Sequence, residues 1–379
     1  MYLPDFSTYR MGNLGTYRGL KQIHLVWRIL CLAPWTKFHK CYYICMSIIL
    51  GFNMFLMSTI ILDVVFCGNF RCAFNNVTYY LALVCKVIQY LVMLLVQKKL
   101  FQVDRLFHIL DEHVVLPEDQ VVANKAIEKG QRILKYFLSA CLLSVYCKIV
   151  GLLFTSGQVP ILPLWSPFED YFVIKLLYDS TIGHLIILQT IANDMYAPIC
   201  FLLLNAHLKI LSQQLLRAGC GEQEYPTQSN ISTLVKCHVT ILKIYKILDE
   251  TIPKMFFVVL LIASILLCIS ITSIITNSLE PSDIIFTVGL TSILMFQILP
   301  ICVLAHQFQS LSEEVADAAY ASNWPDQDRA FRRAILLIIQ RAQNCKPIVV
   351  CGIVPINLPT FLSIVRCAYS FSAIYSMMN

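Results

Sequence analysis

Seven long apolar stretches constrain the fold of this 379-residue chain more than any other feature. A helix needs about 20 apolar residues to cross the roughly 30 Å hydrocarbon core of a bilayer. The stretches that meet this length are residues 41–66, 76–96, 134–154, 171–204, 253–276, 284–304 and 358–378. Only 14% of the residues are charged, whereas a soluble domain has about 25%. The sequence therefore predicts an all-α, seven-transmembrane-helix membrane protein, and it argues against a disordered chain, a nucleic-acid-binding protein and a cytosolic enzyme.

The basic residues predict the orientation of these helices. Of the 29 Lys and Arg residues, 24 lie in the segments on one side of the predicted membrane, and Arg71 alone lies in a loop on the other side. Basic loops stay in the cytoplasm. The N-terminus is therefore predicted to be cytoplasmic and the C-terminus extracellular, which is opposite to a G-protein-coupled receptor. The D-R-Y and N-P-x-x-Y motifs of those receptors are also missing from the expected positions.

The segments outside the spans predict four regions. Residues 1–40 form a cytoplasmic N-terminal segment with no apolar leader, and residues 20–35 read as an amphipathic helix at the membrane surface. Residues 41–304 hold the first six spans, of which the fourth and fifth extend into the cytoplasm. Residues 305–357 have apolar positions at helical spacing and predict cytoplasmic anchor helices, and residues 358–379 form the last span. These cytoplasmic helices either form a compact bundle or lie loosely on the surface.

Motifs for catalysis or metal binding are lacking in the sequence. The 16 Cys residues show no repeated pair at zinc-ligand spacing, and neither HExxH nor GxSxG occurs. We therefore expect no enzyme activity, catalytic residue, metal or cofactor. On the predicted outer face, Asn76-Val77-Thr78 is an acceptor for N-glycosylation, and Cys67 and Cys72 are two thiols that either pair or stay free.

Charges inside the predicted spans need partners, because a central charge costs about 2.5–3.5 kcal/mol on insertion scales. Lys175 and Asp179 are four residues apart on one helix and can pair with each other. Asp194 is predicted to be hydrogen-bonded in a structural role. Lys86 has no predicted partner, and a water-filled cavity is one way to accommodate it. Lys148 also needs a partner.

Several motifs along the chain resemble those of a known family, the insect odorant receptors. The C-terminal signature is carried by residues 312–320, Trp324, residues 331–336, Gln343, Gly352, residues 355–358, Phe361 and residues 369–371. Residues 189–198 and 162–167 add to the resemblance, which covers essentially the whole chain. One departure is that Asn344 and Cys345 separate Gln343 from Lys346-Pro347.

This resemblance implies a subunit of a ligand-gated, non-selective cation channel. Four subunits would surround one pore in a heterotetramer, with the seventh helices lining it and the cytoplasmic helices anchoring the subunits. The partner would be the family's shared co-receptor, Orco, because the fourth–fifth loop lacks the long insertion of Orco and so resembles a ligand-tuning subunit. The expected location is the plasma membrane of a sensory neuron dendrite. The expected contacts are small volatile odorants, membrane lipids and permeant cations, with no nucleic acid.

The resemblance also implies residues of the pore and gate. Ile374 and Met378 match the gate positions and lie four residues apart, on one helix face, and Ser370 lies on the pore helix. An apolar ring there closes a pore by dewetting. The alternative role for these residues is ordinary packing against a neighbouring subunit. Arg366 is expected to reach toward the cytoplasm or to pair with an acid.

The family's odorant pocket lies in the outer half of the subunit, and the matching positions here are mostly aromatic and aliphatic. Such walls suit small volatile ligands. For each residue, core packing is the alternative role. The candidate ligand-binding residues are Tyr79, Tyr80, Leu83, Tyr146, Val150, Phe154, Tyr178, Thr181, Ile182, Ile271 and Phe286.

Two other functions are compatible with a helical membrane protein. A gustatory-type receptor channel of the same superfamily would differ in ligand class, and the C-terminal motif favours an odorant receptor. A transporter is less favoured, because the seven spans do not divide into inverted repeats with paired broken helices. The sequence does not name the odorant or the stoichiometry.

Overall fold

The computed structural model describes residues 15–32, 39–66, 70–154, 166, 168, 171–218, 231–275 and 281–378. Ten helices account for nearly all of the described part, so the all-α prediction is confirmed. They are α1 (Tyr17–Ile29), α2 (His39–Phe66), α3 (Phe70–Asp111), α4 (Pro117–Phe154), α5 (Phe172–Asp194), α6 (Tyr196–Arg217), α7 (Ile231–Ile275), α8 (Pro281–Ala321), α9 (Arg329–Gln343) and α10 (Leu358–Met378). Strands β1 (Val349–Val350) and β2 (Val354–Pro355) pair in an antiparallel hairpin.

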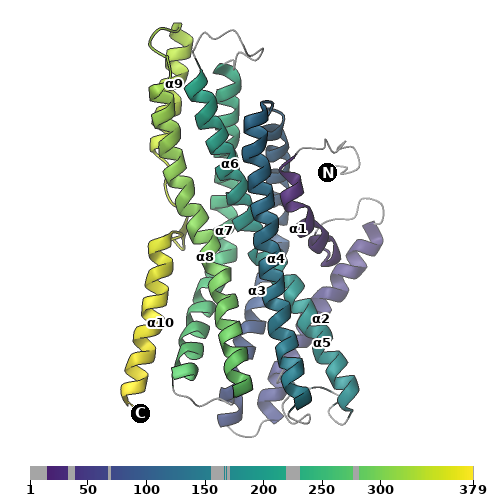
Figure 1. Cartoon of the computed structure of the whole chain (residues 1–379). Helices are drawn as coiled ribbons and strands as arrows, with labels where there is room; N and C mark the ends of the chain where they lie inside the picture. Colours follow the sequence, from purple (N-terminus) through teal and green to yellow (C-terminus); the bar gives the residue numbers. More distant parts are fainter. Residues whose placement is uncertain are drawn as a thin grey trace.

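Four of the helices are much longer than a membrane span. Helices α3, α4, α7 and α8 contain 42, 38, 45 and 41 residues. At 1.5 Å per residue they measure about 57–68 Å, roughly twice the hydrocarbon thickness. One end of each of these helices lies with α6 and α9 at the upper end of the molecule, whereas α10 and the C-terminus lie at the lower end (Figure 1). Helix α6 and the first half of α7 continue beyond the predicted fourth and fifth spans, and the prediction that these extensions lie in the cytoplasm is not tested by the helix lengths.

Five helical segments of the described chain are long and apolar enough to cross a membrane. They are Tyr42–Asp63, Tyr80–Asp111, Phe172–Arg217, Ile231–Thr272 and Thr287–Ala321, and Leu358–Ile374 is a shorter apolar helix. The predicted third span lies within α4, which carries several lysines and is not among the five. The boundary predicted between residues 304 and 305 falls inside α8, which continues unbroken to Ala321.

The predicted fourth span is not one helix but two. Helix α5 ends at Asp194, Met195 lies between the helices, and α6 begins at Tyr196. Pro198 accounts for the break, because it has no N–H to donate to the carbonyl of Asp194 four residues earlier. Pro253 and Pro300, by contrast, lie inside α7 and α8, which continue through them. The α5–α6 segment is the most buried candidate span and forms the centre of the bundle.

Helix α1 packs into the protein with one face. Leu20, Ile23 and Trp27 are at most 1% exposed and belong to the main core, whereas Leu25 and Ile29 are exposed. The contacts of α1 are with α3, α4, α5 and α6. Helix α1 is therefore anchored to the other helices by one face, and its position at the membrane surface remains a prediction.

The chain between α9 and α10 makes a tight turn. Cys351 and Gly352 both have positive φ, 51° and 70°, as the two central residues of a type I′ hairpin turn do. The turn is closed by a hydrogen bond from the Ile353 N–H to the Val350 carbonyl. The hairpin sets the start of α10 at Leu358, as the Gly and Pro residues in this segment predicted.

Candidate functional site

Several of the predicted ligand-binding residues come together between α2, α3 and α5. Tyr80, Leu83 and Ile182 are buried in a small hydrophobic cluster that also contains Leu56 and Ile60. The Tyr80 hydroxyl donates a hydrogen bond to the Asp63 carboxylate of α2. Tyr178 packs against the same cluster. This outer cluster thus combines an apolar wall with one hydroxyl that is held in place by a carboxylate.

The other predicted ligand-binding residues lie elsewhere. Tyr146 and Val150 of α4 and Thr181 of α5 are exposed in the single chain, and the Tyr146 hydroxyl lies 3.4 Å from His184 Nε2. Ile271 of α7 packs against the main core rather than the outer cluster. The side chains of Tyr79, Phe154 and Phe286, and those of Asn76, Cys72, Lys148 and Met378, are outside the part that the structure describes, as is Cys67.

A buried ion pair lies at the end of α5, beside the break. Lys86 Nζ of α3 is 2.8 Å from Asp194 Oδ2, and the two side chains are only 8% and 3% exposed. Gln89, one turn further along α3, donates to Asp194 Oδ1 at 2.8 Å. The structural role predicted for Asp194 is therefore present, and Lys86 has a partner. Sequence reasoning did not pair them because they are 108 residues apart, although each was a charge of opposite sign that needed a partner inside a span.

Helix α1 contacts the same break through Trp27. The Trp27 indole Nε1 donates to the Ala192 carbonyl at 3.0 Å, in the last turn of α5, where carbonyls lack donors from within the helix. The Trp27 ring lies 4.6 Å from the Tyr196 ring, centroid to centroid, and the Tyr196 hydroxyl donates to the Leu100 carbonyl of α3. The break between α5 and α6 is thus held by α1 and α3 together.

We expect Trp27→Phe to lower the stability of the protein by about 1–3 kcal/mol, because it leaves the buried Ala192 carbonyl without its donor. Trp324→Phe is the matched control, since the Trp324 indole also donates to a carbonyl, that of Tyr320, but at an exposed site. Its expected effect is within about 0.5 kcal/mol. The measurement is the melting temperature of the solubilised protein. Equal shifts for the two variants would show that the Trp27 hydrogen bond does not stabilise the break.

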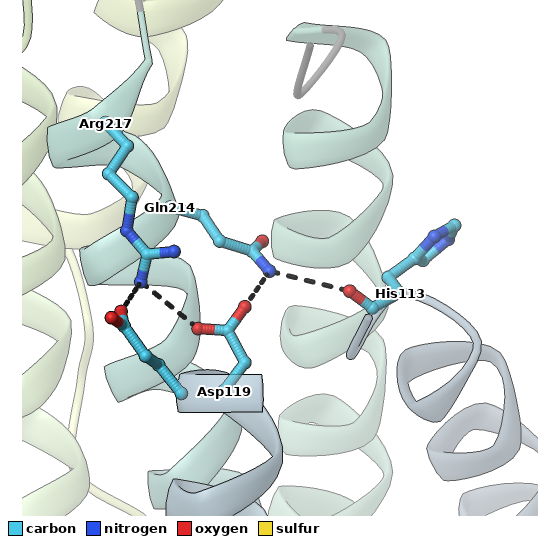
Figure 2. A network of polar contacts seen from close by, with 5 residues as sticks. His113, Asp119, Gln214 and Arg217 are labelled. Atoms are coloured by element: carbon cyan, nitrogen blue, oxygen red, sulfur yellow. Dashed lines mark hydrogen bonds and ion pairs between the residues drawn. The ribbon is translucent and has the colours of Figure 1, made fainter. Parts of the chain in front are cut away.

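The α3–α4 connection is tied to α6 by a polar network (Figure 2). Asp119, in the first turn of α4, is fully buried and accepts hydrogen bonds from Gln214 Nε2 at 2.8 Å and Arg217 Nη2 at 3.3 Å. Gln214 also donates to the His113 carbonyl. A carboxylate at a helix N-terminus is favoured by the helix dipole as well. This network joins the predicted cytoplasmic ends of three helices into one unit.

Further buried contacts at this end favour a compact bundle over loose surface helices. His24 of α1 lies 3.0 Å from Asp104 of α3, between Nε2 and Oδ2. Asp111 accepts hydrogen bonds from the backbone N–H and the hydroxyl of Thr16, which fix the start of α1. The Ser312 hydroxyl of α8 donates to the Ala342 carbonyl of α9. Each contact joins two different helices within the described part of the chain.

Helix α10 has one face on the protein and one face free of it. Phe361, Ala368 and Ser372 are buried against the neighbouring helices α7 and α8. The opposite face, at i, i+4, i+7 and i+11 spacing, is exposed, and we call it the α10 stripe. It consists of Ser363, Cys367, Ser370 and Ile374, with Arg366 at its edge. The predicted gate residue Ile374 is 60% exposed in the single chain.

Helix α9 also leaves apolar residues exposed. Ile335 and Ile338 are buried, whereas Leu336 and Leu337 are 51% and 61% exposed. Ile335 and Leu336 differ in burial because consecutive helix positions point about 100° apart. Asp328 begins the helix by accepting a hydrogen bond from the Phe331 N–H. The exposed leucines give this end of the molecule an apolar surface.

Metal-ligating side chains are not clustered in the described part of the chain. No group of three or more His, Cys, Asp or Glu side chains in these residues is arranged to hold a metal ion. Burial raises the pKa of the Cys31 thiol to about 11 and also raises the pKa of Cys345. Both thiols are therefore protonated at neutral pH and are poor nucleophiles.

Comparison with known proteins gives one consistent match. The model of the 7tm Odorant receptor family matches residues 69–369. Odorant receptor 33b of Drosophila melanogaster is 25% identical over 278 residues, covering 71% of this chain and 73% of that protein. Odorant receptor 59a of the same organism is 20% identical over 359 residues, covering 89% and 88%.

Solved structures show the same fold. The insect olfactory receptor OR5 from Machilis hrabei in complex with eugenol aligns with a TM-score of 0.81 at 15% identity, covering 96% of this chain and 99% of that one. A second structure of the same receptor aligns with a TM-score of 0.77 at 17% identity, covering 96% of this chain and 98% of that one. Helices α1 to α10 are therefore arranged as in an insect olfactory receptor.

Proposed function

Because the chain belongs to the 7tm odorant receptor family, we propose that it is the odorant-binding subunit of a ligand-gated, non-selective cation channel. Membership of this family makes it a receptor of the membrane rather than an enzyme. In the proposed assembly it joins the shared co-receptor Orco in a heterotetramer, in the plasma membrane of a sensory neuron dendrite. Its ligands are small volatile molecules, and its permeant ions are cations.

The α10 stripe is the observation that supports the channel proposal most directly. Ser363 and Ser370 place two hydroxyl groups on the side of α10 that does not pack against this chain, where contact with lipid would be unfavourable. Around a central axis, the same row lines a water-filled path, with Ser363 and Ser370 as polar groups and Ile374 as an apolar constriction. Met378, four residues beyond Ile374, continues the constriction in this proposal. The exposed Leu336 and Leu337 of α9 supply the apolar contact between subunits.

The test of this proposal is whole-cell recording. Cells that express the chain together with the co-receptor should respond to an odorant panel with inward current. Cells that express either protein alone should show no odorant-evoked inward current with the same panel.

For the odorant site, we propose the outer cluster formed by Tyr80, Leu83, Tyr178 and Ile182. Its aliphatic and aromatic side chains supply apolar contact, and the Tyr80 hydroxyl supplies the polar group that orients a ligand. Tyr79, Tyr146, Val150, Phe154, Thr181, Ile271 and Phe286 remain proposed contacts that await the same test. One solved relative is described in complex with eugenol, a small aromatic molecule, which supports a ligand of this size.

We expect Ile182→Val to change the sensitivity to cognate odorants by about tenfold or more, because one methylene in an apolar pocket is worth about 1–3 kcal/mol. Ile191→Val is the matched control, since Ile191 is also buried in α5 but belongs to the main core. The measurement is the half-maximal odorant concentration for several odorants, at equal surface expression. If the two variants shift every odorant alike, the outer cluster is not the odorant site.

For the orientation, we propose a cytoplasmic N-terminus, seven spans and an extracellular C-terminus. The basic residues support it, since 24 of 29 lie in the segments predicted to be on the cytoplasmic side. An epitope added after Asn379 should then bind antibody on intact cells, and an epitope added before Met1 should bind only after permeabilisation. The reverse labelling pattern would contradict this orientation. Modification of Asn76 remains a proposal on the same outer face, and mobility after glycosidase treatment tests it.

A further inference from the structure

A small, partly open cavity lies beside the Lys86–Asp194 ion pair. It has a volume of about 20 Å³ and is lined by residues of α3, α5, α6, α7 and α8. Four of its lining residues are polar, namely Gln89, Asn193, Asp194 and Gln297, and each is at most 8% exposed. The remaining walls are apolar and include Met255 and Phe256. The wall of the cavity is therefore mostly apolar, and the four polar side chains are a minority within it.

Asn193 is the residue that requires an explanation. Its side chain is 5% exposed and lines the cavity, and neither its Nδ2 nor its Oδ1 has a hydrogen-bond partner in the described part of the chain. The Oε1 of Gln89, whose amide nitrogen donates to Asp194, is buried without a partner in the same part. Burying such groups without partners is costly, particularly inside a bilayer. The cavity thus presents one donor and two acceptors that need a ligand.

We propose that this cavity is a binding site for one or two ordered water molecules, which hydrogen-bond to Asn193 and Gln89. A volume of about 20 Å³ fits this number, because a water needs about 10–15 Å³ on this scale and two to four polar partners. The space is too small for an odorant. A cation is disfavoured, because Lys86 and Gln89 already engage the two oxygens of Asp194 and the Lys86 ammonium repels positive charge.

The bound water joins two helices at the point where the α5–α6 segment breaks. Asn193 is the residue before Asp194, at the end of α5, and Gln89 lies on α3. The water therefore adds a third polar link between these helices, next to the two hydrogen bonds made by Asp194. It also explains why an amide occupies a buried position in an apolar helix, where leucine would otherwise pack well.

Radiolytic hydroxyl-radical labelling with mass spectrometry tests this site, because radicals formed from a trapped water oxidise the side chains next to it. Met255 lines the cavity, whereas Met93 and Met195 are fully buried. In the intact receptor, Met255 should be oxidised well above Met93 and Met195, which serve as internal controls. Oxidation of Met255 at the level of these two residues would overturn the proposal.

Asn193→Leu provides the second measurement, because it fills the cavity and removes the polar partners without changing the outer surface near Met255. In this variant, Met255 oxidation should fall to the level of Met93. If Met255 stays as reactive as in the wild type, the label comes from the lipid side and the proposal is wrong. If the variant does not assemble, Gln297→Leu changes another polar residue of the cavity wall, on α8, and Met255 oxidation should fall in that variant in the same way.

Discussion

Replacing Lys86 by Met should destabilise the receptor by about 3–5 kcal/mol, which is the usual cost of leaving one partner of a buried ion pair without the other. Asp194 would keep the hydrogen bond from Gln89 but would lose the Lys86 ammonium, which lies 2.8 Å away and neutralises the negative charge of the carboxylate. Methionine has nearly the length of lysine, so packing is retained and the loss reports the charge. We expect low surface expression and a lower melting temperature.

A double-mutant cycle separates the pair from its surroundings. Asp194→Asn should also destabilise the receptor, because it leaves the Lys86 ammonium buried without a counter-charge. The variant with both changes carries no charge in this part of the bundle and should be more stable than the sum of the single effects predicts. Lys99→Met is the surface control, since Lys99 pairs with Glu250 at an exposed position. The stability of this variant should equal that of the wild type. Strictly additive effects at Lys86 and Asp194 would show that the two side chains do not stabilise each other.

The positions of most helices were predictable, because hydrophobic length and helical spacing are local properties of the sequence. Helix α10, Leu358–Met378, has the bounds predicted for the last span, and α7 extends beyond the predicted fifth span to Ile231. The break at Met195 was not predicted, although Pro198 is a local signal. Pro253 and Pro300 explain why, since both lie inside continuous helices and the effect of a proline depends on its packing.

The candidate site was less predictable, because it depends on contacts between distant segments. The sequence identified Lys86 and Asp194 as charges that need partners, but only the fold brings α3 against the end of α5. For the predicted ligand-binding residues, helical spacing did not decide which side of each helix packs against the other helices. Tyr80 and Ile182 are buried in the outer cluster, whereas Tyr146 is exposed in the single chain.

Expression of this chain without the co-receptor should abolish nearly all odorant-evoked current. The α10 stripe and the exposed leucines of α9 are suited to contact with other subunits, and a single chain cannot enclose a pore with one helix face. Addition of the co-receptor should restore the current without changing the outer cluster of this chain, which is the proposed odorant site. The odorant ranking should therefore follow this chain, and Ile182→Val should change it in the assembled channel.

The most direct measurement is whole-cell voltage clamp with a broad odorant panel, on cells that express this chain with the co-receptor, this chain alone or the co-receptor alone. Surface labelling of both proteins provides the expression control. The account predicts odorant-evoked inward cation current only in cells that express both. Robust odorant-evoked current from this chain alone, or no response to any odorant when both proteins are at the cell surface, would contradict it.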